Sequence, residues 1–371
     1  PVSARHLFDL ATRAPGLTAL FDHIRRRIGA EGPLRLDDYM TEALAHPEFG
    51  YYMTGDPLGR AGDFVTAPEV SQMFGELIGL WCAHVWTQMA RPEMVPLVEL
   101  GPGRGTLMAD ALRAANRVDG FLAAAHVHMV ETSPSLQKRQ RRNLSTLTVP
   151  VSWHQHFAQV PAAPVLIIAN EFLDALPVRQ FVRGPDGWAE RCVCLDDSGD
   201  ALAWIDQPTD TPADLPDAVV GELVEISPAR AAIAAELAAA IAAHGGAALL
   251  IDYGHGKSAP GDTLQAIKGH QFHDALADPG EADVTAHVDF AAIAAAADSS
   301  VRVSGPVTQG AFLTALGIEA RAAQLRGGAT PRQAGEVLEA LKRLIGPAEM
   351  GTLFKVMALS HKDQPAPEGF A

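Results

Sequence analysis

The chain has 371 residues, of which 48% are hydrophobic and 20% charged, as is usual for a globular protein that buries a core. A formal net charge of −15 argues against a nucleic-acid partner, because phosphate binding needs clustered lysine and arginine. Three cysteines cannot form a disulfide framework, no apolar run reaches the length of a membrane span, and the N-terminus lacks a signal pattern. These features predict a cytoplasmic protein without membrane insertion.

Residues 1–93 are predicted to form a helical extension with a lid loop. Apolar residues at helical spacing predict helices over 18–28 and 72–89. The glycine-rich loop between them could be a plain connector, but functional groups concentrate on loops and this loop lies just before a predicted strand. Its candidate ligand contacts are Gly62, Asp63, Phe64, Thr66 and Pro68.

The stretch from residue 95 to about 116 predicts a buried strand, a glycine turn and a helix. Glycines at alternate positions allow backbone N–H groups to approach a ligand closely. The dinucleotide fingerprint G-x-G-x-x-G is not met, because Thr106 occupies the place of its last small residue. The pattern is acid-x-G-x-G-x-G, formed by Glu99, Gly101, Gly103 and Gly105, and it resembles the cofactor motif of S-adenosylmethionine (SAM) dependent methyltransferases. The alternative is that these glycines only form a tight connection.

Two further predicted strands end in polar residues. The strand over 126–131 ends at Glu131, where an acid can accept hydrogen bonds from ribose hydroxyls, although it could also be a surface carboxylate. The continuous apolar run over 164–169 predicts a strand buried on both faces. It leads into Asn170, Glu171 and Asp174, at the strand end where ligands bind in such sheets. Alternatively, these three residues could only cap the start of a helix.

The remaining chain completes a catalytic domain over 94–360. A weak third strand over 149–153 ends at Trp153, which could stack on adenine or lie in the core. Residues 178–226 are predicted to form an inserted β flap, 247–251 a fifth strand, 255–290 a long loop, and 361–371 a disordered tail. Helices are predicted near 289–297, 309–315, 318–325 and 331–345. The histidines show no ligand spacing, so no metal site is predicted.

Five ordered motifs together resemble the MidA family of SAM-dependent methyltransferases. They are Gly62–Glu69, Glu99–Gly105, Asn170–Pro177, Ile251–Gly254 and Asp283–Phe290. The resemblance implies an α/β fold of class I, with a Rossmann-like sheet, an N-terminal helical extension and an inserted β flap. It implies SAM as cofactor, S-adenosylhomocysteine as product, and methylation of a protein arginine, since the mitochondrial member acts on a subunit of the respiratory NADH dehydrogenase. A bacterial member would act in the cytoplasm on an equivalent subunit.

The resemblance and the residues together give a site hypothesis. Glu171, helped by Asp174, would bind the guanidinium of the target arginine through bidentate hydrogen bonds. Glu99, Glu131, Asn170, the glycine turn and the lid loop would hold SAM. A methyltransferase for a small molecule and a SAM-binding assembly chaperone remain alternatives, and the sequence does not predict the oligomeric state.

Overall fold

The computed structural model describes residues 18–54, 65–210 and 215–370. The chain divides into two compact units. The first unit draws on Pro1–Pro57, Ala175–Ala229 and Ala259–Ala286, and the second on Leu58–Asp174, Arg230–Ser258 and His287–Ala371. These units do not coincide with the predicted boundary at residues 93 and 94, because part of the N-terminal segment groups with the predicted flap.

The first unit contains two small sheets with short helices. Its elements are α2 (Ala19–Glu31), β1 (Leu34–Arg35), α3 (Leu36–Ala45), α4 (Tyr51–Thr54), β6 (Arg179–Arg183), β7 (Trp188–Leu195), β8 (Leu202–Thr209), β9 (Leu223–Ile226), β11 (Gln265–Lys268), β12 (Gln271–His273) and β13 (Asp283–Thr285). One sheet has the order β1-β7-β6-β9 with β8 paired to β7, and Leu34 pairs with Val193 across β1 and β7. The other has the order β12-β11-β13. The prediction of a long loop over 255–290 is therefore wrong, because strands of three or four residues carry no readable period.

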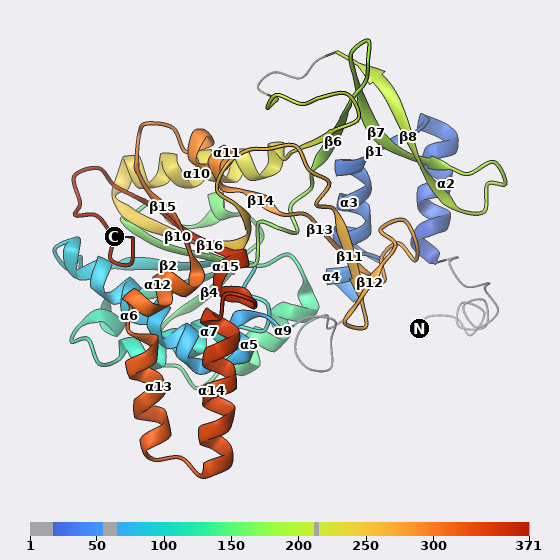
Figure 1. Cartoon of the computed structure of the whole chain (residues 1–371). Helices are drawn as coiled ribbons and strands as arrows, with labels where there is room; N and C mark the ends of the chain where they lie inside the picture. The colour runs from blue at the N-terminus through green and yellow to red at the C-terminus, as the bar shows by residue number, and fades with distance from the viewer. Residues whose placement is uncertain (1–17, 55–64, 211–214, 371) are drawn as a thin grey trace. The chain divides into compact units, whose positions relative to one another are not determined.

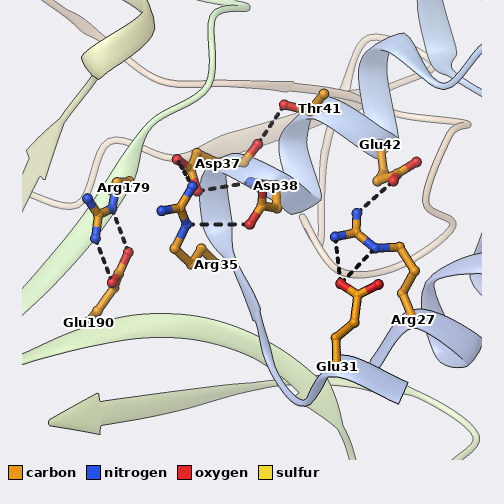
Figure 2. Close-up of polar contacts among 9 residues, drawn as sticks. All are labelled: Arg27, Glu31, Arg35, Asp37, Asp38, Thr41, Glu42, Arg179 and Glu190. Carbon is orange, nitrogen blue, oxygen red and sulfur yellow. Dashed lines mark hydrogen bonds and ion pairs between the residues drawn. The ribbon is translucent and has the colours of Figure 1, made fainter. Parts of the chain in front are cut away.

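Ion pairs connect the elements of the first unit (Figure 2). Arg179 on β6 donates through Nε and Nη2 to the two carboxylate oxygens of Glu190 on β7, at 2.7 and 2.8 Å. Arg27 on α2 donates to Glu42 on α3 at 2.7 Å. Bidentate pairs with fixed geometry stabilise more than single exposed pairs. These contacts therefore hold α2 against α3, and β6 against β7.

The second unit is built on an eight-stranded sheet. Its strands are β2 (Val95–Leu100), β3 (Ala125–Val130), β4 (Val151–His154), β5 (Val165–Asn170), β10 (Gly246–His255), β14 (Val288–Asp289), β15 (Arg302–Thr308) and β16 (Phe354–Ser360). The order is β15-β16-β10-β5-β2-β3-β4, with β14 paired to β10. Strand β16 is antiparallel to both neighbours, whereas β10, β5, β2, β3 and β4 pair in parallel. The predicted Rossmann-like sheet is confirmed.

Helices cover both faces of this sheet (Figure 1). They are α5 (Ala67–Val70), α6 (Gln72–Gln88), α7 (Thr106–Ala115), α8 (Phe121–Ala124), α9 (Pro134–Asn143), the 3₁₀ turn η1 (Phe157–Gln159), α10 (Pro228–His244), α11 (Phe290–Ala296), α12 (Gln309–Ala315), α13 (Ile318–Gly327), α14 (Pro331–Ile345) and α15 (Met350–Leu353). Helices α6 and α7 lie on one face, and α10 and α11 on the other. All six residues of β5 are buried, which explains its uninterrupted apolar sequence. The parallel strands bring the carboxyl ends of β2, β3, β5 and β10 to one edge.

The segment that follows β16 packs against the second unit. The Trp81 indole N–H donates to the carbonyl of Glu368 at 3.1 Å, and the ring of Phe370 contacts that of Phe312. The prediction of a disordered tail is therefore wrong for residues 361–370, because its terminal aromatic residue reaches the core. No helix in the described ranges is long and apolar enough to cross a membrane.

Candidate active site

The glycine turn joins β2 to α7 as predicted. Gly101, Gly103 and Gly105 have φ angles of 61°, 52° and 79°, in the left-handed region that disfavours other residues. A Cβ on Gly101 would lie 2.8 Å from a ring carbon of Phe172. The backbone conformation at all three positions, and the close packing at Gly101, therefore require glycine. The Gly101 and Gly105 N–H groups donate to the carbonyls of Val130 and Pro102, at 3.1 and 2.7 Å, so these two glycines shape the turn itself.

Glu99 lies inside β2, two residues before the turn. Glu99 is 3% exposed, and burial raises the pKa of its carboxyl to about 8. Its buried Oε2 accepts no hydrogen bond from the residues that the structure describes. A buried acceptor without a partner is costly, and a cationic ligand group would compensate that cost. The turn and this carboxylate together fit a ligand that carries an ammonium group, as the methionine moiety of SAM does.

Glu131 follows β3 and is held by neighbours of its own unit. Its Oε1 accepts from the Ser133 N–H at 2.8 Å, and its Oε2 accepts from Gln140 Nε2 at 3.1 Å. Burial raises the pKa of its carboxyl. Carboxylate oxygens have further acceptor capacity, so Glu131 can still receive ribose hydroxyls. The structure thus places Glu131 beside the glycine turn rather than on an open surface.

Gln140 on α9, which is not among the predicted site residues, connects three parts of this region. Its Nε2 also donates to the carbonyl of Gly103 at 2.8 Å, and its Oε1 accepts from the Trp153 indole N–H at 2.9 Å. The side chain is fully buried. Trp153 itself lies under the guanidinium of Arg141, 3.9 Å from the ring centroid. A glutamine within a strongly basic helix is the sequence signal for a buried polar role.

Glu171 begins the loop after β5 in a strained backbone conformation. Its φ is +51°, which is uncommon for a residue other than glycine and often marks a functional site. Its Oε1 accepts from the Ala67 N–H at 2.8 Å and from Asn170 Nδ2 at 3.0 Å, while its Oε2 accepts nothing from the described residues. Burial, with a smaller contribution from Asp174, raises its carboxyl pKa to about 7. The buried Oδ1 of Asn170 also has no partner in the described structure.

The Ala67 contact brings the end of the predicted lid loop to Glu171. Thr66 precedes α5, and Pro68 is buried in its first turn. Glu69 on α5 accepts from the Thr106 hydroxyl at 2.6 Å, which ties this segment to the first turn of α7. Gly62, Asp63 and Phe64 lie outside the described residues.

Asp174, in the loop after β5, and Asp252, inside β10 at the level where β5 ends, form an acidic group. The Tyr253 hydroxyl donates to Asp174 Oδ2 at 2.7 Å. Asp252 accepts from the Leu173 and Asp174 N–H groups at 2.9 and 3.1 Å, and so fixes the loop that carries Asp174. Burial and the charges of Asp174 and Glu171 raise the pKa of Asp252 well above its ordinary value.

Arg230 is the cation buried beside these acids. Its guanidinium donates to the carbonyls of Leu173 at 2.7 Å, Asp174 at 3.1 Å and His287 at 2.7 Å. Arg230 and Asp252 are not among the site residues predicted from the sequence. A lone arginine in the alanine-rich α10, and the Asp-Tyr-Gly sequence at a strand end, are the signals that could have found them.

One group in the described residues could offer three ligands to a metal ion: His23, Glu42 and His46 of the first unit. Glu42 already accepts from Arg27. His46 Nδ1 accepts from the Glu48 and Phe49 N–H groups, both at 3.2 Å. These contacts favour an ion-pair cluster over a ligand set, because the carboxylate and one ring nitrogen are engaged.

Comparison with known proteins identifies the family. A family model of S-adenosyl-L-methionine-dependent methyltransferases matches residues 77–307. The mitochondrial protein arginine methyltransferase NDUFAF7 of Danio rerio is 36% identical over 92% of this chain and 86% of its own length, and that of Mus musculus is 38% identical over 92% and 84%. A crystal structure from Burkholderia thailandensis, bound to S-adenosyl-homocysteine, has a TM-score of 0.83 at 29% identity and covers 100% of this chain and 97% of that one.

These similarities extend over nearly the whole chain and include the turn, the strand ends and the loops described above. The sheet order matches the class I fold that the motifs implied. The cofactor of the family is SAM, and the solved relative holds its demethylated product. The chain therefore belongs to this family of SAM-dependent methyltransferases, the MidA family.

Proposed function

We propose that the protein methylates an arginine side chain of a protein substrate. The carboxylate group of Glu171, Asp174 and Asp252 at the ends of β5 and β10 carries the proposal, because a guanidinium is a planar cation that carboxylates recognise. The relatives named as protein arginine methyltransferases support it. The implied substrate is a subunit of respiratory NADH dehydrogenase or its bacterial equivalent.

The cofactor would be held by the edge of the sheet that contains the glycine turn. Bound SAM supplies a methyl group on a positively charged sulfur. Glu99 would face its ammonium group, Glu131 its ribose hydroxyls, and the turn of Gly101, Gly103 and Gly105 its chain. Asn170 and the lid residues Gly62, Asp63, Phe64, Thr66 and Pro68 would complete the site.

Glu171 would orient the arginine for transfer. Its Oε1 is occupied by the Ala67 N–H and by Asn170, which leaves Oε2 for a guanidinium N–H. Methyl transfer would form one N–C bond while the S–CH3 bond of SAM breaks and S-adenosylhomocysteine leaves. The methylated guanidinium would then lose a proton from the nitrogen that was attacked. A carboxyl group with a pKa of about 7 is half ionised at that pH and charged above it, and its charged form can receive that proton. Asp174, fixed by Tyr253 and Asp252, would bind the second edge of the guanidinium.

Substituting Gly103 by valine is expected to weaken S-adenosylhomocysteine binding about ten- to hundred-fold. A β-branched residue at a φ of +52° is strained, and its side chain would occupy the face offered to the ligand. Isothermal titration calorimetry measures the change. Gly335→Val is the control, because a Cβ at Gly335 meets no atom within 4 Å. Unchanged affinity in Gly103→Val would show that the turn is only a structural connection.

The arginine assignment is tested by the chemical identity of the methylated group. The purified protein and radiolabelled SAM are added to an extract from cells that lack the gene, and the proteins are hydrolysed to amino acids. Label in methylarginine is the expected result. Label in another amino acid, or only in the small-molecule fraction, would contradict the proposal. Calorimetry is the control for the preparation, which should bind SAM and S-adenosylhomocysteine but not NAD.

A further inference from the structure

Helix α9 is basic in a chain whose net charge is −15. Its sequence contains Lys138, Arg139, Arg141 and Arg142 and no acidic residue. Cations in the last turn of a helix complement its dipole, which would account for Arg141 and Arg142 alone. The helix dipole does not account for Lys138 and Arg139, which lie earlier in the helix. Nor does it account for a further arginine that lies nearby on another segment.

That further arginine is Arg104 in the glycine turn. Asn143 Nδ2 donates to its backbone carbonyl at 2.8 Å, and Gln140 holds the neighbouring Gly103. An open pocket of about 240 Å³ lies here, lined by Arg104, Arg139, Arg142 and Asn143. Three arginines from two segments thus line one hollow, directly beside the turn proposed to hold the cofactor.

The outer face of α9 leaves positive charge for an incoming partner. Lys138 and Arg142 are exposed, and neither forms an ion pair with a described residue. Lys138 and Arg142 lie four residues apart on the helix, where like charges repel, and an anion beside them would relieve that repulsion.

We propose that this pocket, together with Lys138, is a docking surface for an acidic segment of the protein substrate. The inference rests on the proposed function, because it requires a protein acceptor. Arginine forks bind carboxylates through paired hydrogen bonds, and complementary charge speeds association and fixes register. A nucleic acid fits less well, since the chain as a whole is acidic and the ring of Trp153 is covered by Arg141 instead of being open for base stacking.

The test uses the full chain and a fluorescently labelled oligoglutamate peptide, with binding followed by anisotropy at low ionic strength. The expected result is saturable binding that weakens about ten-fold in the double variant Lys138→Glu, Arg142→Glu, and by a smaller factor in Arg142→Gln. Added salt should weaken it further. Arg326→Glu on the exposed end of α13 is the matched control and should bind as the parent does.

Calorimetry with S-adenosylhomocysteine separates docking from folding and from the cofactor site, and its affinity should be unchanged in every variant. Equal oligoglutamate binding by the parent and the double variant, or no binding by the parent, would overturn the proposal. Tighter binding of a single-stranded oligouridylate than of oligoglutamate would also overturn it, in favour of RNA. None of these measurements requires methyl transfer, so they remain informative if the arginine assignment fails.

Discussion

Replacing Glu171 by glutamine is expected to lower the rate of methyl transfer about 100- to 1000-fold, while the affinity for S-adenosylhomocysteine changes little. Glutamine keeps an oxygen that can accept from the Ala67 N–H and from Asn170, so the local structure should persist. The variant loses the negative charge that would attract the guanidinium and the base that would receive its proton. The loss should therefore fall on the chemical step.

The pH profile gives this prediction a second signature. The ligand-free Glu171 carboxyl has a pKa raised to about 7, so it is protonated below that pH and charged above it. Because the charged form is the competent one, kcat/KM of the parent should rise as the pH increases through about 7. The residual activity of Glu171→Gln should lack this ascending limb.

Radiolabel transfer into protein measures the rate, and calorimetry measures cofactor affinity. Glu336→Gln, on an exposed part of α14, is the control for a loss of one negative charge. Loss of S-adenosylhomocysteine binding in Glu171→Gln would instead make Glu171 a cofactor or structural residue. Full activity would exclude it from catalysis and leave Asp174 as the principal carboxylate.

The parts of the site that could be predicted from the sequence are those in which one short segment contains its own signal. The apolar run of β5 identifies a buried parallel strand, and its end places Asn170 and Glu171 at the edge of the sheet where the carboxyl ends of the parallel strands meet. The alternating glycines identify the turn because the backbone at each of these positions adopts a positive φ, which favours glycine. In both cases, local sequence and tertiary structure demand the same residues.

The parts that could not be predicted depend on partners distant along the chain. Gln140 and Arg230 matter through contacts with Gly103 and Leu173, and nothing in their own helices reveals those partners. The pairing of Leu34 with Val193 joins the N-terminal segment to the predicted flap, although the whole stretch Leu58–Asp174 of the second unit lies between them in the sequence. Such pairings are set by tertiary packing, which a pattern of period 2 or 3.6 does not encode.

The second large effect is expected at Glu99, where the cost of burying a carboxylate opposes its proposed role in cofactor binding. An ordinary glutamate carboxyl has a pKa of 4.5, whereas burial raises that of Glu99 to about 8 in the folded protein. Between these pH values the folded state holds a proton that the unfolded state has released. The free energy of unfolding of the ligand-free protein therefore falls as the pH rises from 4.5 to about 8, and the decrease amounts to about 3 to 5 kcal/mol.

Glu99→Gln should remove this cost, because a neutral amide replaces the carboxylate and has nothing to ionise. At pH 8 the ligand-free variant is expected to be more stable than the parent by about 3 to 5 kcal/mol, and at pH 5 the two should be nearly equal. The same substitution should weaken SAM binding about ten- to hundred-fold, since the buried charge proposed to face its ammonium group is lost.

Urea denaturation at pH 5 and pH 8 measures the stability difference, and hydrogen exchange of the β2 amides assigns it to the second unit. Calorimetry with SAM measures the loss of affinity, and Glu319→Gln on the exposed surface of α13 should change neither quantity. Equal stabilisation at both pH values would attribute the effect to packing rather than to ionisation. If the variant is more stable and still binds SAM as the parent does, the buried charge serves no cofactor. If the variant gains stability but loses SAM binding, the ligand-free fold retains a costly carboxylate because the cofactor requires it.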